Sequence, residues 1–157
     1  DYTDYVQHID TYDSWTETGR TTAVNYGTAT MLMSPSVTGM ARLSFSPWRD
    51  VASNSLKTTT LSVDGKYVGK QYMDNTMAES RSIPAYFVSN LTLSHEFEMR
   101  TGMLGLSLYV NNLFNNMYYA DGWCWKNIVE EDGSLIDGIG VYPQAPRNFM
   151  LKVSWRF

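Results

Sequence analysis

Phe149-Met150-Leu151-Lys152-Val153-Ser154-Trp155-Arg156-Phe157 is the stretch that decides the fold class of this chain. Apolar or aromatic side chains occupy every odd-numbered position and alternate with mostly polar ones, which predicts a β-strand with one apolar and one polar face. Two opposite environments favour such a strand: a soluble core with water outside, or lipid outside with a wet lumen inside. The rest of the sequence distinguishes between them.

The composition restricts the classes of protein to which the chain can belong. Of its 157 residues, 43% are hydrophobic, 14% aromatic and only 18% charged, yet the mean hydropathy is −0.30. No apolar run approaches the roughly 18 residues of a membrane helix, so any membrane crossing must use a β-barrel. The net charge of −4 argues against nucleic-acid binding. A lone cysteine, Cys124, provides neither a disulfide framework nor a thiolate metal site.

Four further segments repeat the two-faced pattern. One face of each segment carries most of its apolar residues. These faces are Val37, Gly39, Ala41, Leu43 and Phe45; Thr59, Leu61, Val63, Gly65 and Tyr67; Phe87, Leu91, Leu93 and Phe97; and Leu104, Leu106, Leu108 and Val110. Each segment reaches about 9–11 residues or more, the length that a tilted strand needs to cross a bilayer. Strands of soluble proteins usually have about 5–6 residues. The excess length favours the membrane alternative. Pro47 is expected to end the first segment.

The predicted connections alternate between short and long. Residues 98–102 form a short turn and residues 49–56 a modest one, whereas residues 13–28, 74–84 and 120–147 are expected to be long and irregular. Short turns at one rim and long loops at the other are typical of outer-membrane barrels. The sequence therefore predicts an all-β fold built as an antiparallel transmembrane β-barrel.

Several motifs resemble the TonB-dependent outer-membrane receptors. A recurring element of that family is similar to residues 66–76 (KYVGKQYMDNT) together with residues 83–88 (IPAYFV). The Asn-Leu-Phe-Asn/Asp signature of its penultimate strand resembles residues 110–115 (VNNLFN). Its last strand is similar to residues 146–149 (PRNF) continuing to the aromatic Phe157, and the top of an earlier strand to residues 1–6 (DYTDYV). These motifs follow the family's order and span essentially the whole chain.

The resemblance implies a barrel of about 22 strands, of which residues 1–157 supply the last five to six. The family's N-terminal plug domain, and the short box that engages its energy transducer, have no counterpart in this sequence. The implied function is energy-coupled import of a scarce ligand across the outer membrane of a Gram-negative bacterium. Ferric siderophores, haem, cobalamin and oligosaccharides are the ligand classes, and the fragment alone is not expected to transport.

The resemblance also implies a set of partners. They are the remainder of the barrel and the plug domain, a TonB-type energy transducer reached through the missing N-terminal part, the barrel-assembly machinery, outer-membrane lipid and a small ligand. No cofactor, no nucleic acid and no enzymatic activity are expected.

Candidate functional residues fall into three groups. The first group consists of charged residues on the polar faces of their strands: Arg42, Asp64, Lys66 and Glu96. A charge in lipid near mid-membrane costs about 2–4 kcal/mol, so these residues are predicted to face the lumen or the plug. Aromatic residues in the predicted loops are candidates for ligand contact because their rings can stack on a ligand; they are Trp15, Tyr118, Tyr119, Trp123, Trp125 and Tyr142. The alternative for this group is loop packing or an interfacial aromatic belt. The resemblance further implies that Phe157 acts as an insertion signal read by the barrel-assembly machinery.

Three other functions remain open from the sequence. A small autonomous outer-membrane barrel of eight strands, with a structural or adhesion role, needs about three more strands from residues 1–36, where the pattern is poor. A soluble lipocalin-like carrier should have shorter strands and an apolar interior. A membrane enzyme is disfavoured because no nucleophile–base pattern is present.

Overall fold

The computed structural model describes residues 2–13, 15–49 and 58–157, and its fold is all-β with antiparallel sheets. Within these residues no sheet closes into a barrel. The chain divides into two compact units. Unit 1 comprises residues 1–37, 69–85 and 118–144, and unit 2 comprises residues 38–68, 86–117 and 145–157. No helix of the described residues is long and apolar enough to cross a membrane.

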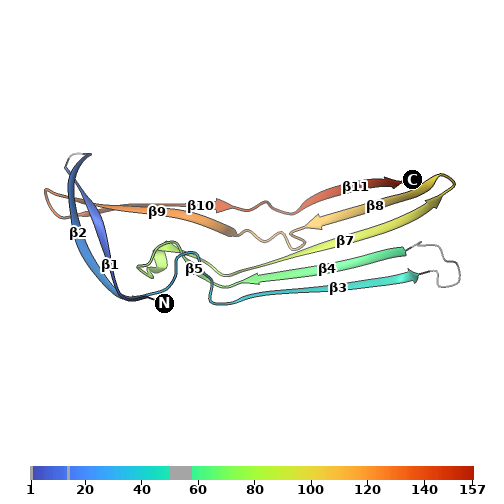
Figure 1. Ribbon diagram of the computed structural model, residues 1–157, viewed down its shortest axis with the longest axis horizontal. Coiled ribbons are helices and arrows are strands. Elements are labelled where there is room, and N and C mark those ends of the chain that lie inside the picture. The colour runs from blue at the N-terminus through green and yellow to red at the C-terminus, as the bar shows by residue number, and fades with distance from the viewer. Residues whose placement is uncertain (1, 14, 50–57) are drawn as a thin grey trace. The chain divides into compact units, whose positions relative to one another are not determined.

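Unit 2 is a five-stranded antiparallel sheet with the strand order β11-β8-β7-β4-β3 (Figure 1). Its strands are β3 (Thr38–Arg49), β4 (Thr58–Val68), β7 (Tyr86–Met99), β8 (Gly102–Asn111) and β11 (Asn148–Arg156). All five were predicted from the alternating pattern, as was the short turn that joins β7 to β8. One boundary was wrong: β3 continues through Pro47, because the pairing with β4 shifts between Phe45 and Trp48, and such a bulge tolerates a residue without an N–H group.

The register of unit 2 aligns apolar residues into rows that cross the whole sheet. One row is Leu43, Val63, Leu91, Val110 and Phe149, and the next is Phe45, Leu61, Leu93, Leu108 and Leu151. Paired residues point to the same side of a sheet, so these rows build one continuous apolar face. Among the strand residues of unit 2 whose side chains the structure describes, every Asp, Glu, Lys and Arg lies on the opposite face. The predicted division of the five strands into two faces is confirmed.

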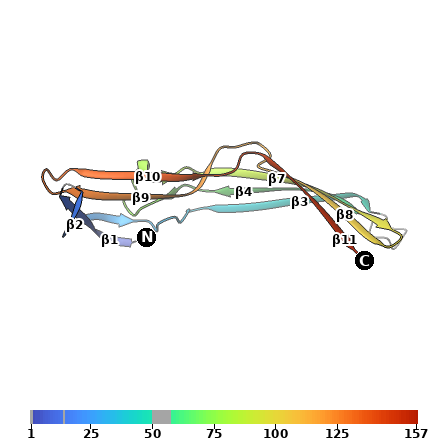
Figure 2. The same cartoon turned by 90° about the horizontal axis from the view of Figure 1, so that it is seen from above.

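Unit 1 contains a four-stranded sheet with the order β10-β9-β1-β2. Its strands are β1 (Tyr2–Asp13), β2 (Thr16–Ala29), β9 (Tyr119–Val129) and β10 (Leu135–Pro143). β1 meets β9 in parallel over only two residue pairs, and the other pairings are antiparallel. Figure 2 shows β9 and β10 running side by side as a long hairpin.

Two of the predicted long loops are therefore wrong. Residues 13–28 mostly form strand β2, whose Thr-rich sequence favours a strand although it shows no two-faced alternation. Residues 120–147 mostly form the β9–β10 hairpin, whose glycines and tryptophans resemble loop composition. The predicted connection over residues 49–56 lies almost entirely outside the described residues.

Residues 69–85 form the compact centre of unit 1. The two-residue strands β5 (Gln71–Tyr72) and β6 (Ser82–Ile83) pair with each other, and η1 (Glu79–Arg81) is a single short 3-10 turn. Asp74 shapes the bend after β5, because its side chain accepts hydrogen bonds from the Thr76 N–H at 3.0 Å and hydroxyl at 2.5 Å. Ile83 is completely buried. The expectation of a largely irregular connection over residues 74–84 agrees with the structure.

Candidate functional site

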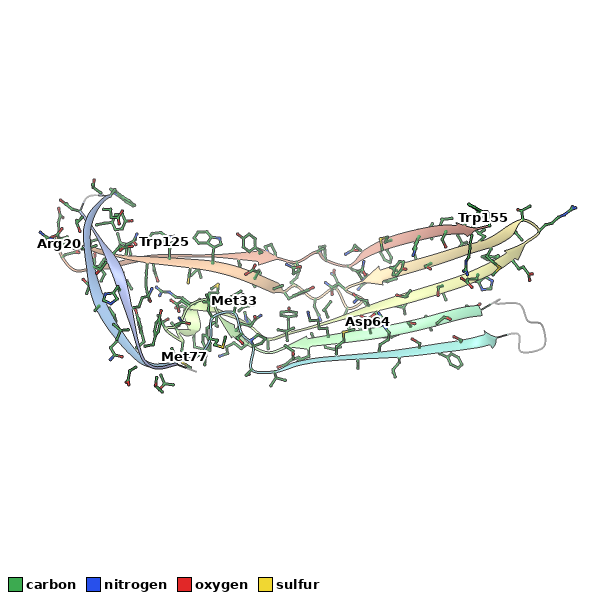
Figure 3. The ribbon with its side chains drawn as sticks, in the orientation of Figure 1. Arg20, Met33, Asp64, Met77, Trp125 and Trp155 are labelled. Atoms are coloured by element: carbon green, nitrogen blue, oxygen red, sulfur yellow. The ribbon has the colours of Figure 1, made fainter. Side chains whose placement is uncertain are left out.

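The polar face of unit 2 carries a hydrogen-bonded network around Asp64, which Figure 3 labels on β4. Arg42 on β3 donates to Asp64 at 3.2 Å, and the side-chain amide of Asn90 on β7 donates to the same carboxylate at 2.8 Å. Asn90 in turn accepts a hydrogen bond from the backbone N–H of Asn112 at 3.0 Å. The network thus links three adjacent strands and the segment after β8 through one carboxylate.

The other charged residues predicted to face a lumen lie on the same face. Glu96 pairs with Arg156 of β11 at 3.1 Å. Lys66 is exposed and has no ion-pair partner within the part of the chain that the structure describes. Arg42 thus pairs with a residue of the adjacent strand, and Glu96 pairs across β8 with a residue of β11.

Trp123 and Trp125 lie on strand β9 rather than in a loop, and Figure 3 labels Trp125 there. They project from the same face, and each is paired across the hairpin with a glycine of β10, Trp123 with Gly140 and Trp125 with Gly138. A Cβ atom at 138 would lie 2.8 Å from Trp125 Cε2, and one at 140 would lie 2.8 Å from Trp123 Cζ2. Only glycine therefore lets the two indoles lie over the neighbouring strand.

Trp125 also lines a cleft of about 260 Å³ in unit 1. Two other aromatic residues, Tyr12 at the end of β1 and Trp15 in the turn before β2, line the same cleft. The remaining lining residues are Asn127, Val129, Glu131 and Ile136. The structure thus brings together Trp15 and Trp125, two of the predicted ligand-contact residues that are 110 positions apart in the sequence.

The other predicted aromatic residues lie outside this cleft. Trp123 and Tyr142 point to the same side of the hairpin as Trp125, because their register partners share that face, and both are exposed. Tyr119 begins β9 and is exposed, and the preceding Tyr118 is half-buried. Asn127 and Glu131 also line the cleft, although neither was among the predicted ligand-contact residues. The alternation along β9 could have indicated Asn127.

The opposite face of β9 holds a buried ion cluster. The side chain of Arg81 is only 7% exposed and donates to Asp74 at 2.9 Å and to Asp137 on β10. Lys126, with a side chain 5% exposed, lies 3.7 Å from Asp74 and donates to the hydroxyl of Tyr26 at 2.8 Å. A buried charge is tolerated only when it is paired, so this cluster fastens residues 69–85 to the β9–β10 hairpin.

The cluster shifts the pKa values of Asp74 and Arg81. Burial, the largest single influence, raises the pKa of Asp74, but hydrogen bonds from Thr76 and Arg81 and the charge of Lys126 outweigh burial and hold the pKa below its ordinary value of 3.8. Burial lowers the pKa of Arg81, but its hydrogen bonds to Asp137 and Asp74 raise the pKa by more. Asp74 and Arg81 are therefore both charged at neutral pH.

Cys124 packs beside this cluster. Its thiol donates a weak hydrogen bond to the carbonyl oxygen of Met73 at 3.6 Å, and burial raises the pKa of the thiol. A protonated, half-buried thiol is a poor nucleophile. Within residues 2–13, 15–49 and 58–157, no group of three His, Cys, Asp or Glu side chains could hold a metal ion.

No family model, curated protein or solved structure matches this chain.

Proposed function

We propose that the five strands of unit 2 are part of the wall of a transmembrane β-barrel, with the apolar face against lipid. The observation that carries the proposal is the exposure of that face: Leu43, Phe45 and Phe149 are 79%, 66% and 68% exposed. A soluble sheet of this kind buries its apolar face against a second layer. A lipid layer would cover this apolar face. It also suits the lengths of these strands, which are 9 to 14 residues.

The placement of the charges supports the same orientation. Each charged side chain on the lipid face would cost about 2–4 kcal/mol near mid-membrane, and all the described acidic and basic strand residues avoid that face. The polar face instead carries hydrogen-bonded pairs such as Ser44 with Ser62 at 2.9 Å and Asn111 with Asn148 at 2.9 Å. Such a face suits a wet lumen.

The sheet edges support a barrel larger than this chain. β3 and β11 are the outer strands of the sheet. Unpaired edge N–H and C=O groups are not tolerated in lipid. Further strands must pair with both edges, so the remainder of the barrel is an obligatory partner.

These features, together with the family resemblance, support a receptor function. We propose that the chain is the C-terminal part of the barrel domain of a TonB-dependent receptor of the Gram-negative outer membrane. That receptor imports a scarce ligand, either a ferric siderophore, haem, cobalamin or an oligosaccharide. In this arrangement the polar face of unit 2, with Arg42, Asp64, Lys66 and Glu96, lines the lumen and faces the plug domain, and the chain by itself does not transport.

The receptor function is tested with the gene and the cell that encode this sequence. We expect several hundred residues upstream of Asp1, including a plug domain and an energy-transducer box. We also expect uptake of one of the four ligand classes to disappear when either this gene or the energy transducer is deleted. A signal peptide directly before Asp1, or uptake that is unaffected by loss of the energy transducer, would contradict the receptor proposal and favour a small autonomous barrel.

A further inference from the structure

The cleft in unit 1 combines aromatic rings with an acidic group. Tyr12, Trp15, Trp125 and the acidic Glu131 line one open cleft, in which Trp15 is 87% exposed. The face of an aromatic ring carries partial negative charge and attracts cations, and Trp attracts them most strongly. We propose that this cleft binds a small organic cation through a quaternary or alkylated ammonium head.

The charges around the cleft support a cation over an anion. No Lys or Arg lines the cavity. The nearby Glu130 is neutralised by Arg20, with which it forms an ion pair, whereas Glu131 has no ion-pair partner among the residues that the structure describes. Glu131 thus provides an uncompensated negative charge at the cleft.

The alternation of side chains along β9 places the buried cation Lys126 on the face opposite the cleft. Lys126 follows Trp125 in the chain, but its ammonium group lies on the opposite face, 3.7 Å from Asp74 and 4.5 Å from the ring centre of Tyr26. Lys126 and Tyr26 form a cation–π pair inside the same unit. The cleft offers its own aromatic rings for the same type of contact, with no protein cation to occupy them.

The size of the cleft limits the ligand to a small one. Its volume of about 260 Å³ is slightly below the roughly 300–1,000 Å³ of sites for drug-sized ligands. A trimethylammonium group with a short tail suits that volume. Free choline-like cations and the headgroups of choline lipids share this chemistry, but a phosphate would lie close to Glu131 and would be repelled, so the free cation is preferred.

The test measures binding of choline to the protein, in a non-ionic detergent, by calorimetry and ligand-observed NMR. The matched control ligand is 3,3-dimethylbutan-1-ol, which has the shape of choline without its charge. We expect choline to bind at least tenfold more tightly than this alcohol. We also expect phosphocholine to bind more weakly than choline. Equal affinity for choline and the alcohol would overturn the proposal by making the cleft merely apolar, and no detectable choline binding would overturn it outright.

Variants assign the binding to this cleft. We expect Glu131→Gln and Trp125→Ala each to weaken choline binding about tenfold, and Trp125→Phe to retain much of it because a ring is kept. Asp121→Asn removes the same charge from the exposed start of β9, outside the cleft, and should leave binding unchanged. Equal losses in Glu131→Gln and Asp121→Asn would show a diffuse charge effect and overturn the site. Tighter binding of phosphocholine than of choline would reject the free cation in favour of a lipid headgroup.

This inference depends only on unit 1 and stands apart from the proposed receptor function. Choline binding is measured without transport and without the energy transducer. The proposed cation site can therefore be disproved while the barrel proposal holds, and the barrel proposal can be disproved while the cation site holds.

Discussion

Replacing Leu93 with arginine distinguishes a lipid-facing sheet from a water-facing one. Leu93 lies on β7, the central strand of unit 2, and its register partners on the apolar face are Leu61 and Leu108. Leu93 is 42% exposed. The row on one side of it is apolar, with Val63, Leu91 and Val110, whereas the row on the other side contains Thr59 and His95 beside Leu106. The adjacent Thr92 lies on the polar face between Ser62 and Tyr109, which makes Thr92→Arg a matched control on the same strand.

The expected loss of stability differs sharply between lipid and water. In lipid, an arginine at position 93 should destabilise the fold by about 2–4 kcal/mol, a 30- to 700-fold change in the unfolding equilibrium at about 1.4 kcal/mol per factor of ten. In water, a half-exposed position accepts arginine for about 1 kcal/mol or less, because its aliphatic stem covers neighbouring apolar surface. Thr92→Arg should cost less than about 1 kcal/mol in either case.

The assay is equilibrium unfolding by urea of the full-length protein in lipid vesicles, followed by tryptophan fluorescence and by heat-modifiable gel mobility. Leu93→Arg should shift the midpoint far more than Thr92→Arg. Equal shifts for the two variants, or a larger shift for Thr92→Arg, would refute the assignment of the apolar face to lipid.

Three further predictions concern other parts of the molecule. Gly138→Ala should destabilise unit 1 by about 1–3 kcal/mol and change the fluorescence of Trp125, because the added methyl group meets the indole; Gly39→Ala, where a Cβ meets nothing within 4 Å, should be close to neutral in the same denaturation measurement. The lowered pKa of Asp74 means that its contribution to stability is fully present above pH 3.8 and is lost as the pH falls through the folded pKa. Unfolding midpoints measured at decreasing pH should therefore fall in the wild type and fall less in Asp74→Asn. Identical pH profiles for the two proteins would contradict this prediction. If the proposed function holds, Phe157→Asp should lower the amount of the protein inserted into the outer membrane several-fold, as quantified on membrane fractions. Normal insertion would remove the proposed role of the terminal aromatic residue.

The strands of unit 2 were predictable because a single physical requirement shapes them. One face of each strand is mainly apolar and the other mainly polar, so residues such as Leu106 and Ser107 alternate strictly. Strand β2 carries polar residues on both sides, for example Thr21 and Thr22, and no alternation marks it. Its pairing with β1 comes from tertiary context, which a local pattern does not contain.

The composition of the β9–β10 hairpin was misleading for a specific reason. Glycines inside a strand normally indicate a loop or a bulge, but Gly138 and Gly140 lie under the indoles of Trp125 and Trp123. The matching Trp-x-Trp and Gly-x-Gly spacings are the sequence feature that could have indicated this pairing.

The ion cluster of unit 1 could not be predicted from the sequence. Arg81 and Asp137 are 56 positions apart, and their pairing depends on how residues 69–85 pack against β9 and β10. No local pattern marks either residue as buried. Glu131 was missed as a cleft residue for the same reason, since the cleft forms only where the pairing of β1 with β9 brings Tyr12 to that end of β9.

The orientation of unit 2 in a bilayer tests the central claim most directly. Spin labels placed singly at Leu106, Ser107 and Leu108 of the full-length protein in lipid vesicles report contact with lipid through oxygen collisions and contact with water through a soluble nickel chelate. The labels at Leu106 and Leu108 should be accessible to oxygen and shielded from nickel, and the label at Ser107 should show the reverse. A lipid-exposed label at Ser107, or water-exposed labels at all three positions, would contradict the account.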